Sequence, residues 1–79
     1  MFKNKTDTGK LNICSGNIAV LRKQMKISQR ELADQLQLIG IDLAKNAIQQ
    51  IESGQRFVID IELRGIAEFF GITTDDLLK

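Results

Sequence analysis

The chain has 79 residues, which is enough for one small domain and too few for two. It is 43% hydrophobic and 27% charged, as in a typical soluble globular protein, and it contains no His, Pro, Trp or Tyr. Without His, no His-containing metal site and no Ser-His or Cys-His pair can form. The lone Cys14 excludes an internal disulfide, and no apolar run approaches the roughly 18 residues of a membrane span. We expect a cytoplasmic protein that is not an enzyme and uses no metal or cofactor.

The net charge of +1 conceals a gradient along the chain. Residues 1–26 carry a balance of +5, residues 27–59 a balance of −1 and residues 60–79 a balance of −3. Such an asymmetry points to nucleic acid or a membrane surface, which the first segment would meet. A solvated tail bearing lysines explains the gradient equally well, so a motif has to decide between the two.

The first 15 residues show no sustained apolar period and are rich in Lys, Asn, Thr and Gly. We therefore expect residues 1–15 to form a flexible arm ahead of one domain over residues 16–79. Helical spacing begins after Ser15, a plausible N-cap, and the apolar face of this first helix comprises Ile18, Leu21 and Met25.

Ser28 followed by Glu31 predicts a capping box at the start of a second helix. Its apolar face comprises Leu32, Ala33, Leu36 and Ile39, and Gly40 ends it. A third helix is expected from Ala44 to Glu52, followed by the C-terminal signal Ser53-Gly54. Its apolar stripe comprises Ala44, Ile48 and Ile51.

Residues 57–59 are apolar and favour β structure, but they are too isolated to pair as a sheet. Asp60 is expected to cap a fourth helix, which Gly71 ends and whose inward face comprises Leu63, Ile66, Ala67 and Phe70. Thr74 with Asp75 and Asp76 begins a short fifth helix that carries Leu77 and Leu78. The sequence therefore predicts one all-α domain of five short helices.

The polar face of the third helix is made of amides and one lysine, without a carboxylate: Lys45, Asn46, Gln49 and Gln50. Asn and Gln can bond adenine bidentately in the major groove, and Lys can bond guanine. An ordinary solvated helix face mixes Glu with Lys. On composition alone, an Asn/Gln-rich surface without function explains the pattern equally well.

Three blocks in register resemble the Xre/Cro-type phage-repressor family. Residues 28–36 (SQRELADQL) and 48–54 (IQQIESG) are similar to its helix-turn-helix pattern S/T-Q-x-x-L-A-x-x-L, then I-x-x-I/L-E-x-G. Residues 66–78 (IAEFFGITTDDLL) resemble its closing I-A-x-x-L-G-V-x-x-D-x-L-L. The resemblance covers about residues 17–78 and implies a compact, five-helix, lambda-repressor-like helix-turn-helix domain.

The resemblance also implies residue roles. Gln29, with the N-terminus of its helix, would grip a DNA phosphate, an anion that helix N-termini favour. The base-contacting positions would be Lys45, Asn46 and Gln50, with Ala47 and Gln49 beside them. Further phosphate contacts would come from Ser53, Gln55 and Arg56. Arg22 and Glu52 would form an internal ion pair between the first and third helices.

The sequence departs from the family pattern in the turn before the third helix. The stretch from Leu36 to Ile48 is about five residues longer than usual, so residues 37–43 lengthen the second helix, enlarge the turn, or both. Ala44 takes the usual Ser/Thr N-cap position, which leaves a capping bond missing unless Asp42 supplies it. Gly65 costs its helix roughly 1 kcal/mol relative to Ala, and a close helix crossing would explain it.

Together these features predict a sequence-specific regulator of transcription, of the repressor type, that binds a double-stranded DNA operator as a homodimer. Candidate dimer contacts are residues 57–59, Leu77 and Leu78. Two alternatives remain at this point. The chain could be the antitoxin of a toxin–antitoxin pair, or an interaction module that has lost DNA binding; a toxin or antirepressor would be its protein partner.

Overall fold

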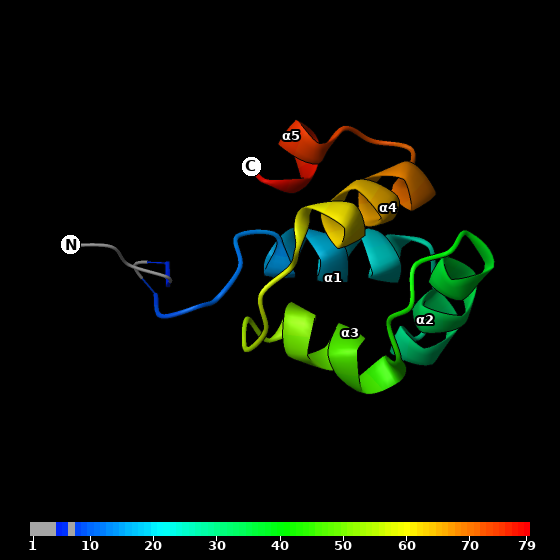
Figure 1. Cartoon of the computed structure of the whole chain (residues 1–79), viewed down its shortest axis with the longest axis horizontal. Helices are drawn as coiled ribbons and strands as arrows, with labels where there is room; N and C mark the ends of the chain where they lie inside the picture. The colour runs from blue at the N-terminus through cyan, green and yellow to red at the C-terminus, as the bar shows by residue number, and fades with distance from the viewer. Residues whose placement is uncertain (1–4, 7) are drawn as a thin grey trace.

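The computed structural model describes residues 5, 6 and 8–79 (Figure 1). Over these residues the chain forms helices and no strand, which confirms the predicted five-helix, all-α class. The helices are α1 (Ser15–Gln24), α2 (Gln29–Leu38), α3 (Lys45–Glu52), α4 (Asp60–Phe70) and α5 (Thr74–Leu77). No helix in this part of the chain is both long and apolar enough to cross a membrane.

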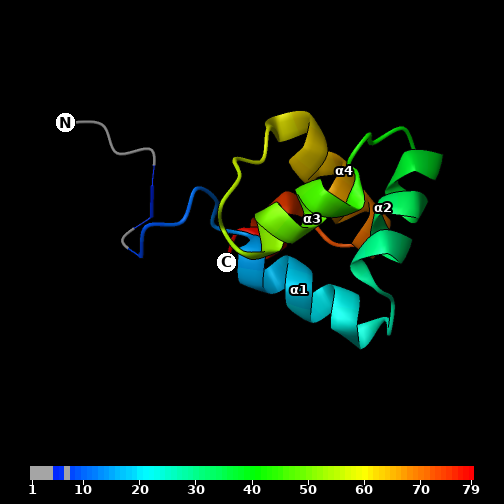
Figure 2. The same ribbon diagram turned by 90° about the horizontal axis from the view of Figure 1, so that it is seen from below.

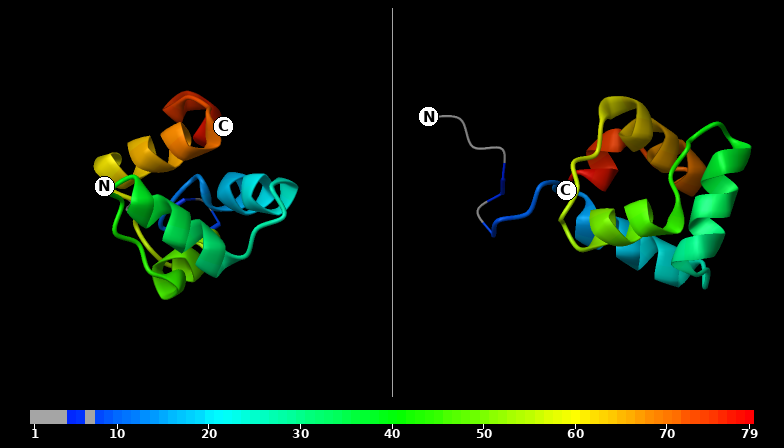
Figure 3. Two further views of the ribbon diagram at one scale, coloured as in Figure 1. Left: turned by 90° about the vertical axis from the view of Figure 1, so that its right-hand side faces the viewer. Right: turned by 60° about the horizontal axis from the view of Figure 1, so that its bottom comes forward.

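The five helices pack around one core, with α1 between α3 and the pair α4–α5. In Figure 1, α3 lies on one side of α1, while α4 and α5 lie on the other side; Figure 2, seen from below, shows α3 in front of α4. Helix α2 closes the end of the bundle and packs against both α3 and α4, as the two views of Figure 3 show. This arrangement places the exposed face of α3 away from α5.

The core is aliphatic, and its centre is formed by Ile18, Leu32, Leu36, Leu43, Ile48, Ile51, Ile66 and Leu77. Burial of such side chains is the main favourable term in folding. The side chain of Leu77 is 0% exposed, so it belongs to this core. The prediction that Leu77 contributes to a dimer surface is therefore wrong, whereas its neighbour Leu78 is 38% exposed.

The capping box predicted for α2 is present. The backbone N–H of Glu31 donates to Ser28 Oγ at 3.0 Å, and the backbone N–H of Ser28 donates to Glu31 Oε1 at 3.0 Å. Two other caps lie one residue before the predicted position, at Cys14 and Ile59. Helix α5 begins at Thr74 as predicted, with Thr73 as its cap. Ala44 does cap α3, and no side-chain bond completes that cap, so Asp42 does not supply one.

The long turn before α3 is enlarged rather than absorbed into α2. Helix α2 ends at Leu38, and Gly40 reverses the chain at a φ of +88°. The turn then places Ile41 and Leu43 in the core. Ile39 and Met25, both predicted to face inward, are both half-exposed. The reason is that each lies at the C-cap, where its helix ends, Ile39 after α2 and Met25 after α1.

Gly65 owes its place in α4 to this turn. A Cβ atom at residue 65 would overlap the side chain of Ile41. The close approach is therefore between α4 and an inserted side chain of the turn, not between two helices. Glycine is a poorer helix former than alanine, but its lack of a side chain at position 65 lets Ile41 of the turn pack against α4.

Candidate nucleic-acid interface

The outer face of α3 carries exposed polar side chains. Burial of Ile48 and Ile51 fixes the rotation of the helix, which leaves Lys45, Asn46, Gln49 and Gln50 exposed and Ala47 half-buried. An open hollow on this face is lined by Asn46, Gln49, Gln50, Ser53 and Gln55. The structure thus brings together five of the nine residues that the resemblance placed at bases or phosphates.

An ion pair between Arg22 and Glu52 fixes the C-terminal end of α3 on the inner side of the helix. The Nε of Arg22 donates to Glu52 Oε2 at 2.7 Å, and its Nη2 donates to Oε1 at 3.0 Å. The two side chains are only 12% and 8% exposed. The remaining Nη1 donates to the carbonyl of Ile27 at 2.9 Å. Arg22, which the resemblance paired with Glu52, therefore ties α1 to the end of α3 and to the turn before α2.

Gln29 belongs to the same cluster. Its Nε2 donates to Glu52 Oε1 at 3.1 Å, so the side chain expected at a phosphate is oriented by the ion pair. An amide nitrogen carries two hydrogens, and the second one is left for an acceptor outside this pair. The carboxylate of Glu52 thus fixes the start of α2 and the end of α3 together.

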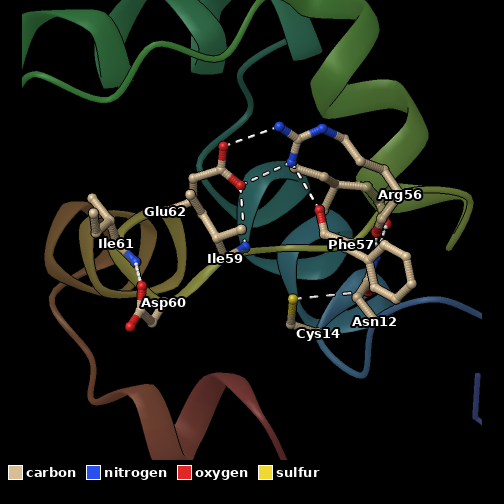
Figure 4. A network of polar contacts seen from close by, with 9 residues as sticks. Asn12, Cys14, Arg56, Phe57, Ile59, Asp60, Ile61 and Glu62 are labelled. Carbon is tan, nitrogen blue, oxygen red and sulfur yellow. Dashed lines mark hydrogen bonds and ion pairs between the residues drawn. The ribbon is translucent and has the colours of Figure 1, made fainter. Parts of the chain in front are cut away.

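Arg56 is engaged inside the protein. Its Nη1 and Nη2 donate to the Glu62 carboxylate at 2.8 Å and 3.0 Å, and Nη1 also donates to the carbonyl of Phe57 at 2.8 Å (Figure 4). The bond from Arg56 lowers the pKa of Glu62, and the same bond raises the pKa of Arg56. The guanidinium expected at a phosphate thus links the segment after α3 to the start of α4, and 32% of the Arg56 side chain stays exposed.

Sequence reasoning missed Glu62, although one signal was present. Glu62 is the third residue of α4, the position at which a carboxylate closes back on the N-cap, and it accepts from the backbone N–H of Ile59 at 3.3 Å. Its partner Arg56 lies six residues earlier across a non-helical segment, where no periodic rule applies.

The end of the expected arm is fixed to the domain. The backbone N–H of Leu11 donates to the carbonyl of Gly54 at 2.7 Å. The Nδ2 of Asn12 donates to the carbonyls of Ile51 at 3.0 Å and Arg56 at 2.8 Å. We call residues 10–14 the strap. A single Asn in a polar stretch carries no sequence signal for such a role.

Cys14 ends the strap inside the core. Its Sγ–H points to Asn12 Oδ1 at 3.8 Å, and burial raises the pKa of the thiol (Figure 4). A buried thiol with a raised pKa is poorly reactive, because the thiolate is the nucleophile.

Acidic side chains gather on the side of the molecule away from α3. Glu68, Asp75 and Asp76 are exposed on the C-terminal half of α4 and on α5 (Figure 1). Two local ion pairs lie there, Arg64–Glu68 at 3.3 Å and Lys79–Asp76 at 3.1 Å. The exposed carboxylates of Glu68, Asp75 and Asp76 are thus separated in space from the amides of α3, whereas Glu62 is paired with Arg56.

Comparison with known proteins places the chain in a family. Residues 17–79 match the helix-turn-helix domain family, in agreement with the motif blocks read from the sequence. No curated protein and no solved structure matches the chain. The family's fold is one of DNA-binding regulators and is not typical of enzymes. Because the match covers most of its length, the chain belongs to the helix-turn-helix domain family.

Proposed function

We propose that this protein is a sequence-specific regulator of transcription, of the repressor type, that reads the major groove of double-stranded DNA with α3. The observation that carries the proposal is the exposed, carboxylate-free face of α3, held in place by the Arg22–Glu52 pair. Membership of the helix-turn-helix domain family supports it.

Base reading falls to Asn46 and Gln50, which are exposed and one helical turn apart. Each amide presents a donor and an acceptor, the pair that adenine N7 and N6 require. Lys45 supplies a cation beside them and can bond guanine. Gln49 and Ala47 flank these positions, where a thymine methyl or the backbone would be touched.

Phosphate contacts fall to residues at both ends of the reading face. Gln29 offers its second amide hydrogen next to the N-terminus of α2, which favours an anion. Ser53 and Gln55 are exposed on the loop after α3. Arg56 is left out of this set because Glu62 already takes its guanidinium.

The active species is a homodimer on a two-fold operator with half-sites about one helical turn, roughly 34 Å, apart. Exposed apolar side chains support a contact between copies, since Phe57 is 52% and Ile59 is 56% exposed. Ile13 lines the same hollow as Phe57 and extends this patch.

Selection from a pool of random duplexes tests the proposal, because the protein should enrich one sequence. On that sequence, Asn46→Ala and Gln50→Ala should each cost about 1–3 kcal/mol, and much less on random DNA. Gln35→Ala is the matched control, since this exposed amide lines a hollow with Met25 and Phe69 away from α3. Equal losses on both kinds of DNA would mean that these amides do not read bases. A pool without enrichment would favour an interaction module.

A further inference from the structure

The buried side-chain amide of Asn12 lies beneath the C-terminal end of α3. Its Nδ2 donates hydrogen bonds to the carbonyl of Ile51 in the last turn of α3 and to the carbonyl of Arg56 in the segment that follows. Only 8% of the residue is exposed. The two carbonyls lie five residues apart in the chain, so the two hydrogen bonds from the amide close the loop between them. We call this pair of hydrogen bonds the staple.

The strap adds two further contacts to this loop. Leu11 bonds the carbonyl of Gly54, and the side chain of Lys10 passes over the Cα of Gly54, where a Cβ would overlap it. Gly54 has a φ of +79°, a conformation that other residues adopt only with strain. The loop that carries Ser53 and Gln55 is thus shaped by the strap on its inner side.

The contacts continue from Asn12 into α4 (Figure 4). Arg56, whose carbonyl accepts from Asn12, pairs through its side chain with Glu62, and Glu62 closes on the N-cap of α4. Asn12 therefore stands where the strap, the end of α3 and the start of α4 meet. The two amide hydrogens of Asn12 satisfy both carbonyls at once, which a hydroxyl with its single hydrogen could not do.

We propose that Asn12 is a positioning residue for DNA reading. By closing the loop over residues 51–56, it fixes the last turn of α3 so that Gln50, Ser53 and Gln55 meet the duplex in one arrangement. The inference rests on the proposed function, and it assigns part of the specificity to a residue that lies outside the matched residues 17–79.

Asn17 provides a matched control. Its Nδ2 also donates to two carbonyls, those of Leu77 at 2.8 Å and Lys79 at 3.2 Å. The bonds are of the same kind, but they fasten α1 to α5 on the side away from α3 (Figure 1). Loss of either amide should lower stability, and only loss of Asn12 should change the reading of DNA.

The experiment compares Asn12→Ala with Asn17→Ala at a temperature where circular dichroism shows both folded. Dissociation constants are measured on the sequence that the wild type selects and on random duplex. We expect Asn12→Ala to lower the ratio of the two affinities about tenfold, as for one lost base contact, and Asn17→Ala to leave it unchanged. An unchanged ratio in Asn12→Ala, or an equal fall in both variants, would overturn the inference. If the wild type selects no sequence, the proposed function itself fails.

A second measurement needs no variant and covers the case in which Asn12→Ala does not fold. In the wild type, the side-chain amide hydrogens of Asn12 should exchange with solvent far more slowly than those of the exposed Asn46. Equal exchange at the two side chains would show that the staple does not hold, and would overturn the inference.

Discussion

The α3 side and the α4–α5 side of the molecule use charged residues in opposite ways. On the α3 side, Arg22 and Glu52 are 12% and 8% exposed; these two residues are 30 positions apart in sequence and join α1 to α3. On the other side, Arg64 and Glu68 are 80% and 64% exposed and lie within one helix. The Arg22–Glu52 pair therefore stabilises the packing of two helices, whereas the Arg64–Glu68 pair is a solvent-exposed contact within one helix.

The difference also decides what each side offers to a partner. Because Glu52 is turned inward, the outer face of α3 presents amides and Lys45 without a competing carboxylate. The α5 side presents Asp75 and Asp76 to solvent. A polyanion can approach the first side and is repelled by the second, so the small net charge of +1 does not argue against DNA binding.

The largest expected effect is the loss of the inner carboxylate. Glu52→Ala should lower the free energy of unfolding by about 3–5 kcal/mol, because Arg22 is left buried without its partner. Glu68→Ala, the matched change on the other side, should cost less than about 1 kcal/mol. Denaturant melts measure both. Similar losses in the two variants would mean that the Arg22–Glu52 pair is no more than a surface contact.

A smaller effect is expected at Gly65. Gly65→Ala should destabilise the fold by about 1–3 kcal/mol, because the new methyl group overlaps Ile41. Gly16→Ala in α1 is the control, since a Cβ there meets nothing within 4 Å and should stabilise the protein by up to about 1 kcal/mol. Thermal melts that show both substitutions stabilising would contradict the packing of the long turn against α4.

Two basic residues near α3 should differ in their effect on salt dependence. Lys45→Ala should reduce the slope of log affinity against log salt by about one unit, because one exposed cation is lost from the face that meets the DNA. Arg56→Ala should leave that slope nearly unchanged and lower stability instead, because its charge is held by Glu62. Affinities measured over a salt series decide between them, and the reverse order would place Arg56 on the DNA.

The smallest expected effect is a dependence on pH. The bond from Arg56 lowers the pKa of Glu62, so the pair adds stability above the ordinary Glu pKa of about 4.3. That stability is lost as the pH falls through the lowered value. Glu62→Gln should therefore lower stability at neutral pH and flatten its fall on acidification. A variant that loses stability with acid as steeply as the wild type would show that Glu62 does not contribute.

Local rules predicted the helices well and the contacts between them poorly. Apolar periodicity and the Ser28–Glu31 box located the elements, because these signals lie within one helix. Gly65 stood out as an anomaly, but its partner Ile41 lies 24 residues away and could not be named from spacing.

The candidate site divides in the same way. The amides of α3 were visible as a carboxylate-free face, and family resemblance supplied the Arg22–Glu52 pair. Asn12 was invisible, because its role depends on two backbone carbonyls rather than on a residue pattern. Side chains that bond backbone groups far away in the chain leave no pattern in a single sequence, unlike those of the capping box, whose partners lie three residues away.

The most direct test of the contrast between the two sides is a titration of the ¹⁵N-labelled protein with the selected duplex. The account predicts that the largest shift changes fall on α3, on the start of α2 and on the loop of residues 53–55. Amides of α5 and of the C-terminal half of α4 should hardly move. Changes centred on α4 and α5, with α3 unaffected, would contradict the assignment of α3 as the reading helix.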